Sequence, residues 1–316
     1  MPDPDPWSWR PAAPARLEKP ISLLRLDGPD TRRFLHGQTS QDLALAPPGS
    51  WRRTCCLTAT GRLRALAEVL IDAEGAWLAI HAGDATAVRA AFDRVLFPAD
   101  DVRLGALQPG LWLEPAELAP PAAGGGCEAL GEAAGWRLEG GAVLLPAGAP
   151  PPADLAARPA LAAPEAERLR IARGEPAAPA ELNEEVNPFE LGLAAWVSLS
   201  KGCYLGQETL AKLAAYDGVK QQLRRWHRPA GGGAPEAGAA LRDAEGNRAG
   251  SITSVLALPE GGWIGLALVR RVALAAPRLW DQAGDGLELS VPEGVQAPPV
   301  GAGGQAGGGV PDPSGG

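Results

Sequence analysis

The chain has 316 residues and a formal net charge of −8, from 29 Lys and Arg against 37 Asp and Glu. A chain of this length can bury a sizeable core and form more than one domain. Its negative charge argues against direct binding to a nucleic-acid backbone, and no run reaches the roughly 18 apolar residues of a membrane span. The proline-broken start lacks the apolar segment of a signal peptide. We therefore expect a cytoplasmic protein with neither a nucleic-acid nor a membrane partner.

The four cysteines predict neither a disulfide framework nor a metal site. Cys55 and Cys56 are adjacent, so on a strand they point to opposite faces and cannot chelate one ion together. The three histidines are scattered, at His36, His81 and His227, and there is no Cys-x-x-Cys pair. We therefore expect no structural zinc and no protein-held iron–sulfur cluster.

The first part of the chain predicts mixed helices and strands after an irregular N-terminal tail over 1–20. Pro29 opens a short helix that Gly37 closes as a left-handed cap, and a second short helix is expected over 39–45. Asp84 is a good N-cap residue for a helix over 85–97. Strands are expected in the apolar runs between turns, at 51–57, 63–71, 76–81 and 102–107.

The periodic pattern that indicates helices and strands weakens over 108–163, which is rich in Pro, Gly and Ala. A strand pair is expected there, at 134–138 and 142–145. Two helices follow, at 165–173, where Gly174 ends the helix, and at 206–216.

The pattern of apolar and turn-forming residues changes again over 223–295. Short apolar runs alternate there with glycine- and proline-bearing turns, which predicts a small β domain that needs no helix. These runs lie at 251–258, 262–269 and 286–291. The segment 296–316 is rich in Gly and Pro and predicts a disordered tail, because it cannot bury enough surface to offset its chain entropy.

The run from Lys201 to Glu208 places a cysteine in a turn that leads into the helix expected at 206–216. A helix N-terminus carries positive partial charge and free N–H groups, and the Lys201 ammonium adds a cation. Both favour a thiolate, so Cys203 is the one cysteine with a reason to be reactive. The alternative is a half-buried cysteine that packs a loop against a helix, which spacing alone favours because free cysteines are usually buried.

Two further runs contain polar residues suited to a ligand. Glu190 lies between a proline and a glycine in an apolar stretch. Its carboxylate could accept the adjacent N–H donors of an amino-pyrimidine ring, and the alternative is a solvated glutamate in a turn. Gln38, Thr39 and Asp42 lie near a helix junction, where capping explains them as well as a ligand does.

These runs resemble the YgfZ family of folate-binding proteins, within the superfamily of the glycine-cleavage T-protein. The segment 201–208 matches the family's KGCYxGQE signature, with only Leu205 at a variable position. Further resemblances are a helix that ends in Gly-x-Pro at 168–176, a Pro-x-Glu-x-Gly-Leu element at 187–193, a Phe-Leu-x-Gly-Gln block at 34–43, and the turn at Gly61-Arg62. The resemblance covers 21–292 and is weakest over 108–163.

The resemblance implies an α+β fold of the T-protein type. Two interleaved α+β subdomains over 21–222 and a small β-barrel over 223–295 would surround a folate-binding cavity. It implies tetrahydrofolate as the ligand and a role in the assembly or maintenance of iron–sulfur proteins. Those proteins, or their assembly factors, would be the partners of a monomeric chain.

The same resemblance assigns residues to the site. Cys203 would be the signature cysteine, with a catalytic thiol or redox role, and Glu190 would hold the pterin ring. The other expected cofactor-binding residues are Lys201, Tyr204, Gln207 and Glu208.

The sequence departs from the family pattern just after the signature helix. Asp217 and Gln222 stand where relatives commonly carry basic residues. A folate has carboxylates on its glutamate tail, so this change predicts a weaker contact with the tail. Lys220, Arg224 and Arg225 are the nearby cations that could compensate.

Two other functions stay open beside the iron–sulfur role, and the sequence leaves open whether the chain is an enzyme. The first is a folate-dependent aminomethyl or one-carbon transferase, as in the T-protein, but the T-protein's catalytic carboxylate has no matching position here. His81 with Asp84 is the nearest titratable candidate, although a strand-end histidine beside a helix N-cap is the plainer interpretation. The second is an accessory role in tRNA modification, which the net charge would make indirect.

Overall fold

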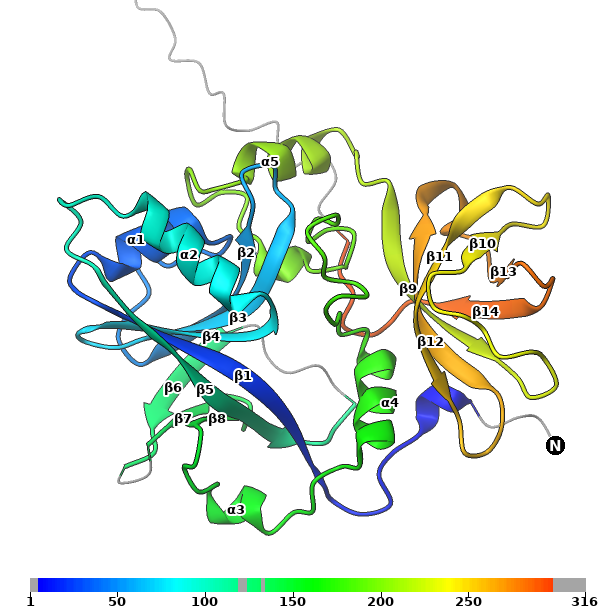
Figure 1. Cartoon of the computed structure of the whole chain (residues 1–316), viewed down its shortest axis with the longest axis horizontal. Coiled ribbons are helices and arrows are strands. Elements are labelled where there is room, and N and C mark those ends of the chain that lie inside the picture. The colour runs from blue at the N-terminus through cyan, green and yellow to red at the C-terminus, as the bar shows by residue number, and fades with distance from the viewer. Residues whose placement is uncertain (1–4, 119–123, 132–133, 298–316) are drawn as a thin grey trace, which may run out of the picture.

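Two closed β-sheets, joined by a helical segment, make up the computed structural model of this chain (Figure 1). The structure describes residues 5–118, 124–131 and 134–297. Helix α4 (Ala163–Arg173) lies between the two sheets, and helices α1 (Thr31–Gln38) and α2 (Ala85–Val95) lie together on one side of the first sheet.

The first sheet closes in the strand order β1-β4-β3-β2-β6-β7-β8-β5. Its strands are β1 (Arg16–Asp27), β2 (Ser50–Leu57), β3 (Leu63–Ile71), β4 (Gly75–Gly83), β5 (Arg103–Pro115), β6 (Gly124–Ala129), β7 (Trp136–Leu138) and β8 (Val143–Pro146). The ladder between β3 and β4 is interrupted once. Leu66 pairs with Ala82 and Ala67 pairs with Ile80, so His81 is an extra residue on β4. Such a β-bulge redirects a side chain.

Helices α1 and α2 bury their apolar faces against the first sheet. Phe34 of α1 and Phe92 of α2 meet edge to face, with ring centroids 5.4 Å apart. The Asp84 carboxylate accepts the Ala87 N–H at 2.9 Å and caps the start of α2, as the sequence predicts. Helix α4 ends at Gly174, whose φ of +71° is the left-handed cap that favours glycine.

The segment after α4 fills the space between the two sheets. It contains η2 (Ala194–Trp196) and α5 (Gln207–Ala215), and the short α3 (Ala153–Ala156) precedes α4. Phe189, Leu191 and Tyr204 pack in one core cluster with residues of both sheets, among them Leu66 and Leu266. One continuous core therefore fixes the second sheet against the first.

The second sheet closes in the order β10-β11-β12-β9-β14-β13. Its strands are β9 (Gln221–Arg228), β10 (Ala240–Arg242), β11 (Arg248–Ala257), β12 (Trp263–Arg270), β13 (Arg278–Trp280) and β14 (Gly286–Ser290). Trp226 is fully buried at its centre with Leu241 and Leu279. The only helical turn of this part, within the described residues, is η3 (Arg271–Ala273).

Several predicted boundaries are wrong. Residues 16–20 are strand rather than irregular tail, because β1 pairs with β5 from Arg16 onward, and η1 (Pro6–Ser8) precedes it. Helix α1 runs through Gly37 to Gln38. No helix forms over 39–45, because the Ser40 hydroxyl accepts the Cys55 N–H and donates to the Trp196 carbonyl instead.

Of the tail predicted over 296–316, all but the first two residues lie outside the described residues, and the Gln296 N–H donates to the Gly192 carbonyl at 2.7 Å. The division of 21–222 into two interleaved subdomains stays a prediction. No helix in the described part of the chain is long and apolar enough to cross a membrane.

Candidate functional site

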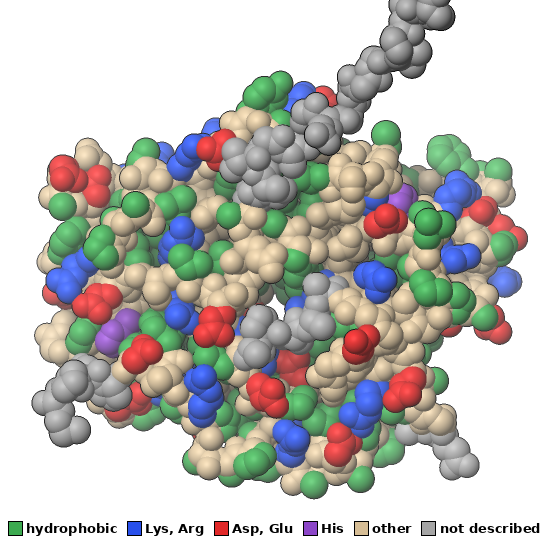
Figure 2. All heavy atoms as spheres, turned by 180° about the vertical axis from the view of Figure 1, so that it is seen from behind, with side chains coloured by type: hydrophobic (Ala, Val, Ile, Leu, Met, Phe, Trp, Pro, Cys, Tyr) green, Lys and Arg blue, Asp and Glu red, His purple; other side chains and the backbone are tan. Residues whose placement is uncertain are grey.

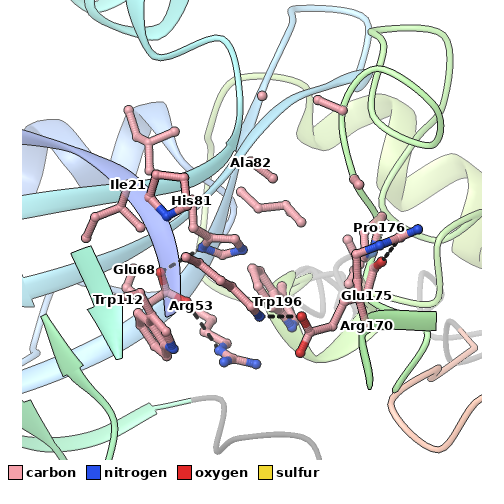
Figure 3. Close-up of a pocket in the computed structure, with 18 of the residues that line it drawn as sticks. Ile21, Arg53, Glu68, His81, Ala82, Trp112, Arg170, Glu175, Pro176 and Trp196 are labelled. Carbon is pink, nitrogen blue, oxygen red and sulfur yellow. Dashed lines mark hydrogen bonds and ion pairs between the residues drawn. The ribbon is translucent and has the colours of Figure 1, made fainter. Parts of the chain in front are cut away.

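A cavity of about 530 Å³ lies between the first sheet, α4 and the segment that follows α4 (Figure 3). Strands β1 to β5 supply one wall, and residues 174–178 contribute to the other. Trp112 and Trp196 are its aromatic lining residues. The charged or titratable lining residues are Lys19, Arg53, Glu68, His81, Arg170, Arg173 and Glu175.

Glu68 and His81 form a hydrogen-bonded pair at the cavity wall. His81 Nδ1 lies 2.9 Å from Glu68 Oε2, and Arg53 Nε lies 3.4 Å from Glu68 Oε1. The Glu68 side chain is 1% exposed and that of His81 is 18% exposed. Burial by itself raises the pKa of Glu68, but His81, Arg53 and Lys19 outweigh it and hold the pKa below its ordinary value. Glu68 is therefore a buried, ionised carboxylate.

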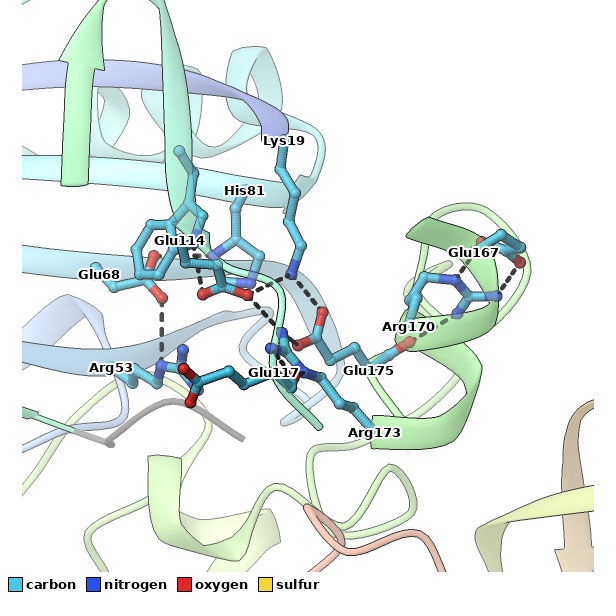
Figure 4. Close-up of polar contacts among 11 residues, drawn as sticks. Lys19, Arg53, Glu68, His81, Glu114, Glu117, Glu167, Arg170, Arg173 and Glu175 are labelled. Atoms are coloured by element: carbon cyan, nitrogen blue, oxygen red, sulfur yellow. Dashed lines mark hydrogen bonds and ion pairs between the residues drawn. The ribbon is translucent and has the colours of Figure 1, made fainter. Parts of the chain in front are cut away.

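A second charged cluster joins α4 to the first sheet (Figure 4). Glu175 binds the Lys19 ammonium and, at 3.1 Å, Arg173, while Arg173 also binds Glu114 and the Glu117 carbonyl. Burial raises the pKa of Glu175, but the charges of Lys19 and Arg173 dominate and hold it well below its ordinary value. These bonds fix Glu175 at the start of the cavity's second wall.

The two tryptophans stand on either side of His81. The His81 ring centroid lies 6.4 Å from that of Trp112 and 5.8 Å from that of Trp196. The Arg53 guanidinium lies 4.9 Å from the centre of the Trp196 ring. Trp112 Nε1 donates to Glu114 at 2.8 Å, which fixes that ring against the wall. The cavity thus has flat apolar surfaces next to titratable groups.

The signature run, in contrast, builds a structural junction outside this cavity. The Lys201 ammonium donates to the carbonyls of His36, Thr39 and Gln41, the last two at 2.7 Å. Burial lowers the pKa of Lys201 to about 7, although the three carbonyl dipoles favour the charged form. Lys201 therefore anchors the end of α1 and the turn after it rather than lining the cavity.

Two other signature residues also serve packing. Tyr204 is 7% exposed and lies in the shared core, with the Lys201 ammonium 4.5 Å from its ring centre. A Cβ on Gly206 would come within 2.8 Å of the Thr58 carbonyl oxygen and 3.0 Å of Gly61 Cα. Gly206 of this run and Gly61 of the Gly61-Arg62 turn are thus explained by one close backbone contact.

The remaining signature residues lie at the surface. Cys203 is exposed, and α5 begins only at Gln207 after its N-cap residue Gly206, so the thiol is not at the helix start. The Glu208 side chain is 83% exposed and pairs with Lys212 one turn along α5. The two causes offered for a reactive Cys203 were the start of a helix and the Lys201 ammonium. The helix starts too far along the chain, and the ammonium is bound to three carbonyls. A redox or catalytic role for Cys203, and a cofactor role for Gln207 and Glu208, stay predictions.

Glu190 is buried but does not line the cavity. Its carboxylate accepts the Asn187 N–H at 3.0 Å and lies 3.8 Å from Arg62. Burial raises the pKa of Glu190 above its ordinary value. The description as a solvated turn residue is wrong, since the residue is only 5% exposed, and its assignment to the pterin stays a prediction that this geometry does not favour.

The altered run after α5 also lies outside the cavity lining. Asp217 binds Arg271 through its carboxylate, and the Gln222 Oε1 atom lies 3.3 Å from Arg224 Nη2. Figure 2 shows acidic and basic side chains intermixed over the face that it presents. No cluster of three metal-binding side chains occurs within the described residues.

Of the residues that line this cavity, only His81 was predicted from the sequence to have a chemical role. Glu68 carried a signal that could have been used, because it is the one acidic residue in the strand from Leu63 to Ile71, whose other residues are apolar except for Arg64. Trp112 and Trp196 gave no such signal, since only the fold brings β5 and η2 together. Glu175 lies in the run 168–176, whose resemblance to the family's Gly-x-Pro element is a signal that could have been used.

Comparisons with known proteins support one fold. No family model matches the chain. Over 108 residues it is 40% identical to a chloroplastic protein of Arabidopsis thaliana described as a "putative transferase", a match that spans 34% of this chain and 24% of that protein. The crystal structure of the glycine cleavage system aminomethyltransferase T from Bartonella henselae superposes with a TM-score of 0.70 at 19% identity, over 91% of this chain and 86% of that one. The chain therefore has the fold of the glycine-cleavage T-protein.

Proposed function

We propose that the cavity binds tetrahydrofolate. The observation that carries this proposal is the cavity itself, whose volume of about 530 Å³ lies within the range of small-molecule sites, ~300–1,000 Å³. It combines flat aromatic surfaces with charged groups, and it occurs in a chain with the T-protein fold. A pterin needs an apolar slot with acceptors at one edge, and a glutamate tail needs cations.

The lining residues fit both ends of this ligand. Trp112 and Trp196 offer ring faces for the pterin or the aminobenzoyl group. Glu175 is the accessible carboxylate, with 26% of its side chain exposed, and its oxygens keep acceptor capacity beyond their bonds to Lys19 and Arg173. We assign to Glu175 the acceptor role that the sequence resemblance gave to Glu190.

The tail carboxylates would meet basic side chains. Four of the residues that line the cavity are basic, and two are acidic. The basic ones are Lys19, Arg53, Arg170 and Arg173. Guanidinium groups bind carboxylates with paired hydrogen bonds, so loss of the cations near Asp217 does not by itself remove the tail's partners.

For the biological role we propose support of iron–sulfur proteins, on the strength of the signature run 201–208. Cys203 is exposed on the surface, where it could meet a partner protein. In cells that lack the chain, iron–sulfur enzyme activities should fall and should be restored by the native chain but not by a Cys203→Ser variant. Full restoration by Cys203→Ser would remove the thiol from this role.

A second candidate is one-carbon or aminomethyl transfer on the bound folate. It is favoured by one observation, the pair of His81 and buried Glu68 at the cavity wall. A transfer to nitrogen needs a group that accepts a proton, and the sequence analysis found no carboxylate for that task.

The test is a titration with tetrahydrofolate, followed by quenching of tryptophan fluorescence. The native chain should bind, Glu175→Gln should bind about ten- to a hundredfold more weakly, and Glu190→Gln should bind like the native chain. Circular dichroism checks that both variants fold. Trp196→Leu, which leaves the Glu175 bonds intact, should also weaken binding. No binding by the native chain would overturn the proposal, and weakening by Glu190→Gln alone would place the ligand elsewhere.

A further inference from the structure

The bulge in β4 lies at His81, a titratable residue that lines the cavity. Leu66 pairs with Ala82 and Ala67 pairs with Ile80, so His81 has no residue opposite it on β3. In a regular ladder successive side chains alternate between the two faces of the sheet. Ala79 packs in a core cluster with Ile21 and Trp112, so this alternation puts His81 on the same face of β4. His81 lies there at the cavity wall, which its neighbours Ile80 and Ala82 also line (Figure 3).

The Glu68 carboxylate decides which nitrogen of His81 is protonated. Glu68 is ionised, so it can only accept a hydrogen bond, and the His81 Nδ1 atom at 2.9 Å must donate it. In the neutral ring, Nε2 is then the atom with a free lone pair. Within the described residues no hydrogen bond to Nε2 is formed, and the ring lines the cavity.

The arrangement is that of a general base held by a buried carboxylate. The carboxylate fixes the tautomer and stabilises the imidazolium once the ring has taken a proton. Glu68 is 1% exposed and is itself held by Arg53 on β2. A histidine that met a carboxylate by chance at the surface would not be expected to have a buried partner that is itself held by an arginine, as Glu68 is held by Arg53.

We propose that His81 is the proton-accepting residue of the cavity and that Glu68 is its positioning residue. The proposal rests on the proposed function, because the proton donor is an N–H group of the folate bound there. It gives the transfer candidate a base, with Glu68 as the partner of His81 in place of Asp84.

The proton transfer balances for a one-carbon donor that carries a protonated amine. A folate nitrogen forms a bond to the methylene carbon with its lone pair, and the bond from that carbon to the amine breaks. The electron pair leaves with the amine, which departs neutral. The folate nitrogen then carries a positive charge and an extra proton, and this proton moves to His81 Nε2.

Several charged groups face the same space and set the field at His81. Lys19 comes from β1, Arg53 from β2, Arg170 and Arg173 from α4, and Glu175 from the loop after α4. Asp84 follows the end of β4, where it caps α2 through the Ala87 N–H. A pH effect is therefore assigned to His81 only where a His81 variant removes it.

The first test needs no ligand. Nitrogen NMR of the imidazoles should show His81 protonated at Nδ1, and His36 is the internal control with the opposite tautomer. His36 Nδ1 accepts the N–H groups of Leu43 and Ala44, both at 3.2 Å, while its Nε2 lies 2.9 Å from the Lys201 carbonyl. Glu68→Gln should abolish the His81 preference and leave that of His36 unchanged. A His81 ring protonated at Nε2 alone would overturn the proposal.

The second test measures proton release when tetrahydrofolate binds. Calorimetry is done in buffers of different ionisation enthalpy, from about pH 5.5 to about pH 8, where histidine titrates. If binding needs a neutral His81 ring, the native chain should release up to one proton on binding at the lower pH values. Its affinity should then fall by up to about tenfold for each unit of decrease in pH. His81→Gln should lose this release, and His227→Gln, on β9 in the second sheet, should keep it.

The outcomes separate the two proposals. No tetrahydrofolate binding by the native chain would overturn the proposed function and with it the partner assigned to His81. Binding with equal proton release by the native chain and His81→Gln would overturn only the role of His81. Because His81→Gln could disturb the bulge, Glu68→Gln serves as the second variant, and it should shift the pH at which the release occurs.

Discussion

Replacement of Lys201 by methionine tests whether the most conspicuous sequence motif is structural. The Lys201 ammonium donates to three carbonyls, those of His36, Thr39 and Gln41. Methionine keeps the length and apolar character of the side chain but has no donor. The three carbonyls would then have to find water in a region where Thr39 is fully buried.

The expected loss follows from these bonds. Hydrogen bonds to a charged group contribute about 1.5 kcal/mol each at the low end, or roughly 4–5 kcal/mol for three. Freeing the side chain returns about 2 kcal/mol of rotamer entropy. We therefore expect Lys201→Met to lower the free energy of unfolding by about 2–3 kcal/mol at a pH of about 6, below the lowered pKa of Lys201, which is about 7.

Urea unfolding followed by tryptophan fluorescence measures this loss. Lys212→Met is the matched control, because its side chain is 65% exposed and pairs only with Glu208; no measurable change is expected there. If Lys201→Met were as stable as the native chain, or more stable, the cost of burying the ammonium would exceed the gain from its three bonds. The structural explanation of the signature lysine would then be wrong.

Three further outcomes follow from burial and charge. Iodoacetamide should label Cys203 first, because it is exposed, whereas burial raises the pKa of Cys127 to about 11 and that of Cys56 to about 12; peptide mass mapping at short times decides this, and equal labelling of Cys56 would contradict it. Arg173→Met should lower the free energy of unfolding in urea by about 3–5 kcal/mol, because Arg173 is 2% exposed and its loss would leave the buried Glu114 carboxylate without its guanidinium partner. Arg137→Met, which removes a more exposed ion pair with Asp154, should cost far less. The pKa of Glu190 is raised, so its carboxyl group binds a proton more tightly in the folded chain than in the unfolded chain. Its contribution to stability therefore falls as the pH rises above the ordinary pKa of a glutamate. The free energy of unfolding of Glu190→Gln relative to the native chain should therefore increase from about pH 4.5 to about pH 7, and a pH-independent difference would refute this.

Local sequence patterns predicted most of the elements because each pattern has a local cause. The strands at 63–71 and 51–57 and the caps at Asp84 and Gly174 depend on neighbours within a few residues. The helix expected at 39–45 failed for a non-local reason. Ser40 is bonded to Cys55 and Trp196, which are distant in sequence.

The site was harder to predict because the most conspicuous run of the sequence, 201–208, builds a structural junction outside the cavity. Lys201, Tyr204 and Gly206 hold α1, the core and the Gly61 turn together. The cavity residues come from strands β1 to β5, from helices α2 and α4, and from the segments around 174–178, 193–196 and 294. Their proximity is a property of the closed sheet, and the contact of His81 with Glu68 depends on the pairing of β4 with β3, which the residue pattern does not encode.

Amide hydrogen exchange with and without tetrahydrofolate tests most directly where the ligand binds. If the cavity is the site, saturating tetrahydrofolate should slow exchange at 174–178 and 193–196, the loop segments that line it. Exchange over 201–208 should stay unchanged, because that run faces the α1 junction and the surface. Slowed exchange confined to 201–208 or to 187–191 would contradict the account and would return the ligand to the signature run or to Glu190.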